Sequence, residues 1–179
     1  MVEEKLSNKT HKGRPDLTGE HPAGDTGQLL LFLLFFATWL LDVFFLNITY
    51  SGRGESAFPL GNRMAYILLA ISIILLYAGS KQVFRIKNKK PRVIKEGIFR
   101  WIRHPIYLGA VIFYIPFLLF AFSYFAAIVW VIIAGFYIFI ARYEEKLLIE
   151  KFGEEYRQYR REVWFFLPFI KYGDKFNEG

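Results

Sequence analysis

Three long apolar runs, separated by shorter polar segments, dominate the hydropathy pattern of the chain. Residues 28–46 are mostly leucine and phenylalanine, and residues 64–79 and 107–141 contain no charged side chain. A helix needs about 20 apolar residues to cross the hydrocarbon core of a bilayer. Each run therefore predicts membrane-spanning helix, and we expect an all-α, polytopic membrane helix bundle.

The third apolar run is too long for a single crossing. As one helix, residues 107–141 would extend about 52 Å at 1.5 Å per residue, whereas the hydrocarbon core is roughly 30 Å thick. We therefore predict a C-terminal helical hairpin that turns near Phe122, Ser123 and Tyr124, with Pro116 tolerated as a kink in its first helix. The bundle then has about four spans.

The placement of the charged residues predicts the orientation of these spans. Residues 81–103 hold nine lysines and arginines against one acid, and the segment from Arg142 onward holds eight more. The connection between the first two spans holds only Arg53 and Arg63. By the positive-inside rule, both termini and the 81–103 loop of this multi-pass protein are predicted to face the cytoplasm. An even number of spans requires the same arrangement of the termini.

The chain is expected to form one membrane domain with a polar extension. Residues 1–27 lack an apolar period and are predicted to be a flexible tail, which leaves residues 28–179 as a single domain. No secretory signal peptide is evident, because the first apolar run begins only at residue 28 and is long enough to stay in the membrane. The absence of cysteine excludes disulfides and thiolate ligands or nucleophiles, and we expect no metal site.

An amphipathic helix is predicted on the cytoplasmic side after the last span. Charged residues fill the gaps between its apolar positions, and Gly153 is a candidate break. Such a helix lies on the membrane or covers the end of the bundle. The apolar positions recur at helical spacing: Tyr143, Leu147, Leu148, Phe152, Tyr156, Tyr159 and Val163.

Two polar clusters flank the predicted hairpin. Arg103 and His104 come directly before it, and Arg142, Glu144 and Glu145 directly follow it. Because both ends of a hairpin reach the same surface, the two clusters are expected to converge, with donors on one side and carboxylates on the other. Alternatively, the cations only set the topology, and the glutamates begin a solvated helix.

The residues of both clusters resemble a known family. Residues 97–107 (GIFRWIRHPIY) and 144–156 (EEKLLIEKFGEEY), with Tyr159 and Leu167-Pro168, resemble the isoprenylcysteine carboxyl methyltransferases, and also the wider set of membrane methyltransferases that includes phospholipid N-methyltransferases. The resemblance covers roughly residues 85–172, which would be the catalytic half. It implies that S-adenosylmethionine is held at the cytoplasmic ends of the last spans, partly enclosed by the C-terminal helix, while a lipophilic acceptor enters from the bilayer.

The resemblance also implies roles for individual residues. The family's cofactor-binding glutamate falls on Glu144 and its upstream aromatic residue on Phe99, while Arg103 is a further candidate for the cofactor carboxylate. The motif His-Pro-x-Tyr falls on His104, Pro105, Ile106 and Tyr107, and the stretch that lines the adenosine pocket falls on Pro91, Arg92, Val93 and Ile94.

Two departures from the family pattern concern the acceptor and the cofactor contacts. Phe99 replaces the usual tyrosine and lacks its hydroxyl. Ile140 stands where the eukaryotic prenylcysteine enzymes have an arginine, and the nearest arginine is Arg142. A prenylcysteine carboxylate is thereby placed in doubt as the substrate, although the cofactor is not.

The predicted reaction is methyl transfer to a lipophilic acceptor, which could be a lipid, an isoprenoid or prenylcysteine-like carboxylate, an amine or a thiol. A neutral amine or thiol must lose a proton, and Glu145 or His104 could accept it. Arg142 and Glu145 are the candidate catalytic residues.

Two other functions remain open. One is a membrane reductase related to the sterol reductases, although those enzymes are larger and bind a nicotinamide cofactor. The other is a non-catalytic scaffold whose basic loop binds anionic membrane lipids. No nucleic-acid partner is expected, and the sequence leaves the acceptor and the oligomeric state open.

Overall fold

The computed structural model describes residues 24–48, 59–86 and 92–166, and these residues form helices and no β-strand. The all-α membrane bundle predicted from the apolar runs is therefore confirmed. The elements in chain order are α2 (Gly24–Leu40), the π-helical turn η1 (Leu41–Leu46), α3 (Pro59–Ile86), the 3₁₀ turn η2 (Gly97–Arg100), α4 (Pro105–Phe113), α5 (Ile115–Phe120), α6 (Tyr124–Phe152) and α7 (Glu154–Glu162).

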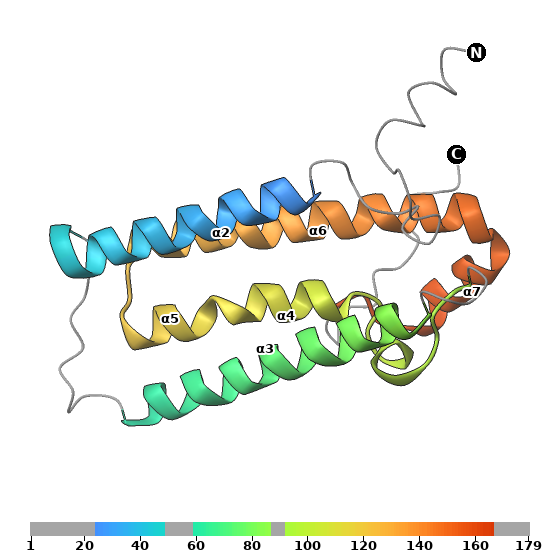
Figure 1. Cartoon of the computed structure of the whole chain (residues 1–179), viewed down its shortest axis with the longest axis horizontal. Helices are drawn as coiled ribbons and strands as arrows, with labels where there is room; N and C mark the ends of the chain where they lie inside the picture. The colour runs from blue at the N-terminus through green and yellow to red at the C-terminus, as the bar shows by residue number, and fades with distance from the viewer. Residues whose placement is uncertain (1–23, 49–58, 87–91, 167–179) are drawn as a thin grey trace, which may run out of the picture.

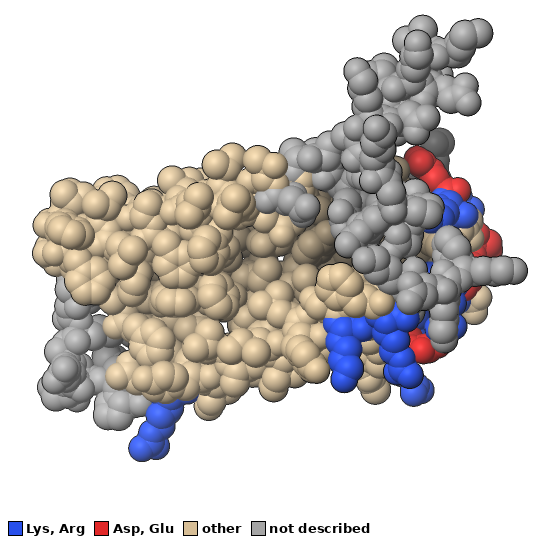
Figure 2. Space-filling model, in the orientation of Figure 1, with Lys and Arg blue, Asp and Glu red and all other residues tan. Residues whose placement is uncertain are grey.

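The helices lie roughly parallel to one long axis (Figure 1). Helix α2 packs along α6, and α4 packs between α6 and α3, with α5 continuing along α3. The loop 92–104 and α7 meet beyond the C-terminal end of α3, and we call this region the charged end. Acidic and basic side chains gather there on the face shown in Figure 2, whereas most of the length of the bundle is uncharged.

Three helices in the described part of the chain are long and apolar enough to cross a membrane: Thr26–Leu46, Asn62–Arg85 and Tyr124–Phe152. Many of their large apolar side chains face outward, as expected for contact with lipid. The remaining predicted span, which forms the first arm of the hairpin, is shorter and covers Pro105–Phe120. At 1.5 Å per residue it is about 24 Å long, less than the roughly 30 Å of a hydrocarbon core.

The first arm of the hairpin breaks close to the proline that was predicted to bend it. Helix α4 ends at Phe113 and α5 begins at Ile115, with Pro116 in its first turn. Proline has no N–H and so releases a carbonyl one turn earlier. Near this break, the indole Nε1 of Trp130 donates to the carbonyl of Val111 at 3.0 Å. A neighbouring helix thus satisfies backbone groups inside the apolar region.

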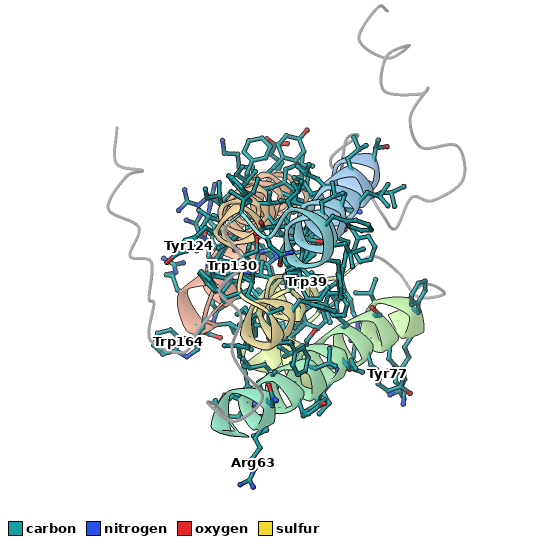
Figure 3. All side chains as sticks on the ribbon, turned by 90° about the vertical axis from the view of Figure 1, so that its left-hand side faces the viewer. Trp39, Arg63, Tyr77, Tyr124, Trp130 and Trp164 are labelled. Carbon is teal, nitrogen blue, oxygen red and sulfur yellow. The ribbon has the colours of Figure 1, made fainter. Side chains whose placement is uncertain are left out.

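The hairpin turn falls at the predicted residues. Ser123 caps α6, and its Oγ accepts from the backbone N–H of Ala126 at 3.2 Å. The indole Nε1 of Trp39 in α2 donates to the carbonyl of Ala121 in the same turn at 2.8 Å. Figure 3 shows Trp39 and Trp130 among the helices, whereas Arg63 and Tyr77 point outward.

Helices α3 and α4 approach each other closely at small residues. The Oγ of Ser72 donates to the carbonyl of Gly109 at 2.9 Å. A Cβ atom at Gly109 would lie 3.0 Å from the Cβ of Leu75 and 3.2 Å from the backbone N of Leu76. In lipid, no hydrophobic force drives helices together. Small residues let their backbones approach closely, so that van der Waals contacts stabilise the packing. The contact fixes the position of α4, and with it the residues that begin that helix.

Replacing Gly109 by alanine is therefore expected to push α3 and α4 apart and lower the free energy of unfolding by about 1–3 kcal/mol, the usual cost of overpacking. The matched control is Gly135→Ala, because nothing lies within 4 Å of a Cβ at Gly135. Removing that helical glycine is expected to leave stability unchanged or to raise it by up to about 1 kcal/mol. Thermal unfolding in detergent measures both, and equal effects would contradict the close packing.

The amphipathic segment after the last span differs from its prediction. It is not a separate helix from Tyr143 onward, because α6 continues without a break from Tyr124 to Phe152. The residues after the apolar run are good helix formers, so nothing ends the helix there. Gly153 does break the chain, with a φ of 56°, and only α7 is a separate amphipathic helix. Its buried face consists of Tyr156 and Tyr159.

The N-terminal residues and Asp42 add two further details. Residues 1–23 of the predicted tail lie outside the described residues, and residues 24–27 already belong to α2. Asp42 is buried in η1, and its Oδ1 accepts from the backbone N–H of Ile48 at 3.1 Å. This contact holds the backbone just after η1.

Candidate functional site

The site begins where the loop of the charged end enters α4. Arg103 and His104 are both buried, and Pro105 occupies the first turn of the helix. Proline is well suited to this position because its φ is already helical and its missing N–H is not needed there. The backbone N–H of Arg103 donates to the carbonyl of Trp164 at 2.9 Å. The loop is thus held between α4 and the segment that follows α7.

The two polar clusters converge as predicted. The Nε2 of His104 lies 3.3 Å from Oε1 of Glu145, and its Nδ1 lies 3.8 Å from Oε2 of Glu144. The hydroxyl of Tyr107 donates to Oε1 of Glu144. The rings of His104 and Tyr107 are stacked, with centroids 5.7 Å apart. Residues about 40 positions apart in the sequence therefore form one contact surface between the start of α4 and the end of α6.

Glu145 is the centre of a buried ion-pair cluster. Its Oε1 lies 2.8 Å from Nε of Arg103, at a distance typical of an ion pair but without hydrogen-bond alignment. Its Oε2 lies 3.6 Å from Nε of Arg160 in α7. The Nη1 of Arg103 also donates to the carbonyl of Arg160 and, at 3.1 Å, to that of Val163. The cluster joins the loop, α6 and α7, which favours a structural role for Glu145.

Burial has the largest effect on the pKa of the His104 imidazole. The imidazole is 6% exposed, and desolvation lowers its pKa below the ordinary value of 6.5. Glu145 opposes this effect, whereas the charge of Arg103 adds to it. A neutral His104 that donates from Nε2 to Glu145 keeps a lone pair on Nδ1. That nitrogen faces Glu144 and has no hydrogen-bond partner among the described residues.

His104 is expected to make stability depend on pH. Because burial lowers its folded-state pKa, the unfolded chain takes up a proton at a higher pH than the folded chain. The free energy of unfolding is therefore highest above pH 6.5 and decreases as the pH falls from there through the lowered pKa. The midpoint of thermal unfolding should drop between about pH 7.5 and about pH 5, and should drop less in His104→Gln. Equal drops in both proteins would exclude the imidazole as the group responsible.

The stretch predicted to line an adenosine pocket is only partly described, since Pro91 lies outside the described residues. Arg92 is exposed and pairs with Glu96 at 3.0 Å. Val93 is buried against the tyrosines of α7, and Ile94 is half-buried. This short stretch therefore runs along the inner face of α7.

The remaining predicted residues fall into two groups. Phe99 lies close to α7, and its carbonyl accepts from the hydroxyl of Tyr159 at 2.6 Å. Ile106 packs against α3, because a Cβ at Gly79 would lie 2.6 Å from its Cγ1. Arg142, by contrast, is exposed on α6, and the contacts from His104 to that helix go to Glu144 and Glu145 instead.

The sequence did not indicate the aromatic cover over His104. The ring of Phe165 lies 5.1 Å from the imidazole and that of Phe166 lies 6.3 Å away, measured between centroids. The guanidinium of Arg103 lies 5.6 Å from the centroid of Phe165. The available signal was the run of aromatic residues that begins at Trp164, which by itself indicates no contact partner.

An open pocket of about 620 Å³ adjoins this arrangement at the charged end. The loop contributes Lys95, Gly97 and Arg100, α7 contributes Tyr159 and Glu162, and Val163 follows directly after α7. Basic and acidic side chains therefore both line the pocket.

Comparison with known proteins places the chain in a family. Residues 19–163 match the model of the family described as "Protein of unknown function (DUF1295)". The chain belongs to the DUF1295 family. The match includes every described helix and ends just after α7.

Curated relatives of this DUF1295 protein carry the names of methyltransferases. The methanethiol S-methyltransferase of Crocosphaera subtropica is 27% identical over 84% of this chain and 54% of its own length. The protein-S-isoprenylcysteine O-methyltransferase of Saccharomyces cerevisiae is 32% identical over 55% and 43%. The methanethiol S-methyltransferase of Mycobacterium tuberculosis is 40% identical over 40% and 28%. The DUF1295 chain thus spans about half, or less, of the length of the curated relatives it matches. The predicted resemblance to the isoprenylcysteine methyltransferases is confirmed.

Proposed function

We propose that the protein transfers a methyl group from S-adenosylmethionine to a small lipophilic acceptor, at the charged end of the membrane bundle. The observation that carries the proposal is the convergence of His104, Tyr107 and Glu144 at the boundary of the apolar region. The methyltransferase names of the relatives support it. By the distribution of cations, the charged end and both termini would face the cytoplasm.

The residues at this site fit the amino-acid end of the cofactor. The Nδ1 lone pair of His104 and a carboxylate oxygen of Glu144 are both acceptors, and they lie 3.8 Å apart. Two acceptors so close together favour a cationic donor between them, such as an ammonium group. S-adenosylmethionine has an ammonium group and, when bound, supplies a methyl group already activated on a sulfonium.

The chain's own contribution would be binding, orientation and exclusion of water. Tyr107 holds Glu144 through its hydroxyl, and Pro105 fixes the start of α4 beneath His104. Phe165 and Phe166 cover the imidazole. We further propose that Arg103 and Ile106 support this constellation and that Arg92, Val93, Ile94 and Phe99 line the adenosine side. Alignment in a dry site is the main requirement for transfer from an activated donor.

Among acceptors, we favour a thiol. Two of the relatives described above are named for a thiol substrate. The position where the prenylcysteine enzymes have an arginine is Ile140 here, and it is buried. A thiol must lose its proton. Glu145 is poorly placed to accept it, because both of its oxygens lie near guanidinium groups, and Nδ1 of His104 is assigned to the cofactor ammonium, so the proton would pass to solvent. A carboxylate acceptor would instead require a role for Arg142.

The test is a methyl-transfer assay on the full chain in detergent, with labelled S-adenosylmethionine. The acceptors are short and long alkanethiols, prenylcysteine, phosphatidylethanolamine and isoprenoid acids. Label in a thioether product would support the proposal. Tight binding of a nicotinamide cofactor with none of S-adenosylmethionine would favour a reductase. Binding that depends only on anionic lipid, with no transfer to any acceptor, would favour a scaffold.

A further inference from the structure

Two tyrosines lie buried in the membrane part of the bundle and have no hydrogen-bond partner in the part of the chain that the structure describes. Tyr114 is 3% exposed at the break between α4 and α5, and Tyr137 is 6% exposed on α6. Neither hydroxyl makes a hydrogen bond to any residue that the structure describes. Near the charged end, the half-buried Tyr107 and the buried Tyr159 both donate from their hydroxyls. The buried Tyr156 of α7 resembles Tyr114 and Tyr137, because its hydroxyl has no partner among the described residues.

These two tyrosines lie deeper in the bundle than the candidate site, on the same two helical segments. Tyr114 follows Tyr107 by seven residues, and Tyr137 precedes Glu144 by seven, so each pair spans about two helical turns on one face. The rings of Tyr107 and Tyr137 have centroids 5.6 Å apart. Tyr137 and Tyr114 belong to one buried cluster of side chains. The row extends about 10 Å from Glu144 along the helix axis.

The surroundings of this row are apolar. Phe35 lies 4.7 Å from Tyr114 between ring centroids, and Leu118, Val129 and Ile133 belong to the same buried cluster. Phenylalanine would fill this space without burying a polar group. A hydroxyl without a partner is unfavourable in such a medium unless water or a polar group of a ligand reaches it. Polar groups kept inside a membrane bundle mark a ligand path by default.

We propose that the hydroxyls of Tyr137 and Tyr114 bind the polar, reacting end of the acceptor as it passes from the membrane part of the bundle to the methyl donor. This proposal rests on the proposed function and deepens it. A phenolic hydroxyl offers one donor and one acceptor, which suits a neutral S–H or O–H group. The pair offers no positive charge, so it selects against carboxylates. Tyr137, which adjoins Tyr107, would contact the reacting atom, and Tyr114 would precede it on the path.

The first experiment is steady-state kinetics of Tyr137→Phe, Tyr114→Phe and the double variant with an alkanethiol. The acceptor KM is expected to rise about three- to tenfold in each single variant, the effect of one lost hydrogen bond. The KM for S-adenosylmethionine should stay unchanged. Because neither hydroxyl has a partner among the described residues, the midpoint of thermal unfolding should stay the same or rise. Unchanged acceptor KM in the double variant would overturn the proposal.

The second experiment measures binding without turnover. Alkanethiols of increasing chain length should raise the midpoint of thermal unfolding of the wild-type protein, since a ligand stabilises the state that binds it. The shift should shrink in Tyr137→Phe and persist in Tyr124→Phe, which removes a 61% exposed hydroxyl from the same helix. An equal shift in both variants, or none in the wild type, would overturn the proposal. A shift that depends on Tyr137, in a protein that transfers no methyl group, would refute the proposed function alone.

Discussion

Glu144→Ala is expected to abolish measurable binding of S-adenosylmethionine while leaving the protein folded. Glu144 supplies the only carboxylate in the described residues that contacts both His104 and the hydroxyl of Tyr107. Its side chain is 18% exposed, so an ammonium group bound there would be largely desolvated. Losing one partner of such a contact costs about 2–5 kcal/mol, which corresponds to a roughly 30- to 5,000-fold weaker affinity.

Isothermal titration calorimetry in detergent measures this affinity directly. Glu150→Ala is the matched control, because Glu150 is an exposed carboxylate on the same helix, six residues further along α6. The control should bind the cofactor like the wild type, and both variants should keep the circular dichroism of a helical protein. If Glu144→Ala were folded and bound the cofactor with unchanged affinity, the proposed position of the ammonium group would be wrong.

Glu145→Ala is expected to give the largest loss of stability. The substitution would leave Arg103 with buried positive charge and no carboxylate, and would also remove the partner of Nε2 of His104. Removing one member of a buried ion pair costs about 3–5 kcal/mol. Unfolding followed by circular dichroism in detergent measures the change.

Glu154→Ala is the control for this prediction. Glu154 pairs with Arg157 and Arg161 on the surface of α7, where its side chain is 68% exposed. Such exposed pairs contribute less than about 1 kcal/mol. In a double variant that also carries Arg103→Ala, the loss of unfolding free energy should be smaller than the sum of the losses in the two single variants. The reason is that Arg103→Ala removes the buried charge that Glu145→Ala leaves unpaired. Additive losses would show that the two side chains are not coupled.

The sequence predicted the features that depend on the local residues or on the length of the apolar runs. Three helices long enough to span the membrane, the turn at Ser123, the bend near Pro116 and the break at Gly153 all follow from the residues at those positions. The meeting of His104 with Glu144 and Glu145 followed from the hairpin alone. A hairpin requires its two ends to lie together, so no tertiary detail was needed.

Other features depend on packing that periodicity does not record. The continuity of α6 through residue 152 was missed, because a change from apolar to amphipathic composition does not end a helix. The contacts of Arg103 with the carbonyls of Arg160 and Val163 involve backbone atoms, which carry no sequence signal. Tyr114 and Tyr137 stood in apolar runs as ordinary residues of a span, and only the facing of α4 and α6 brings them into one row.

The unbroken course of α6 has a mechanical consequence. Its 29 residues form a rod about 43 Å long, with lipid-facing Ile128 and Val131 toward one end and Glu144 toward the other. Helices adjust to a thicker or thinner bilayer largely by tilting. A tilt of α6 carries Glu144 with it, whereas His104 and Tyr107 belong to the separate and shorter α4 segment. We therefore expect membrane thickness to influence the spacing between the two halves of the candidate site.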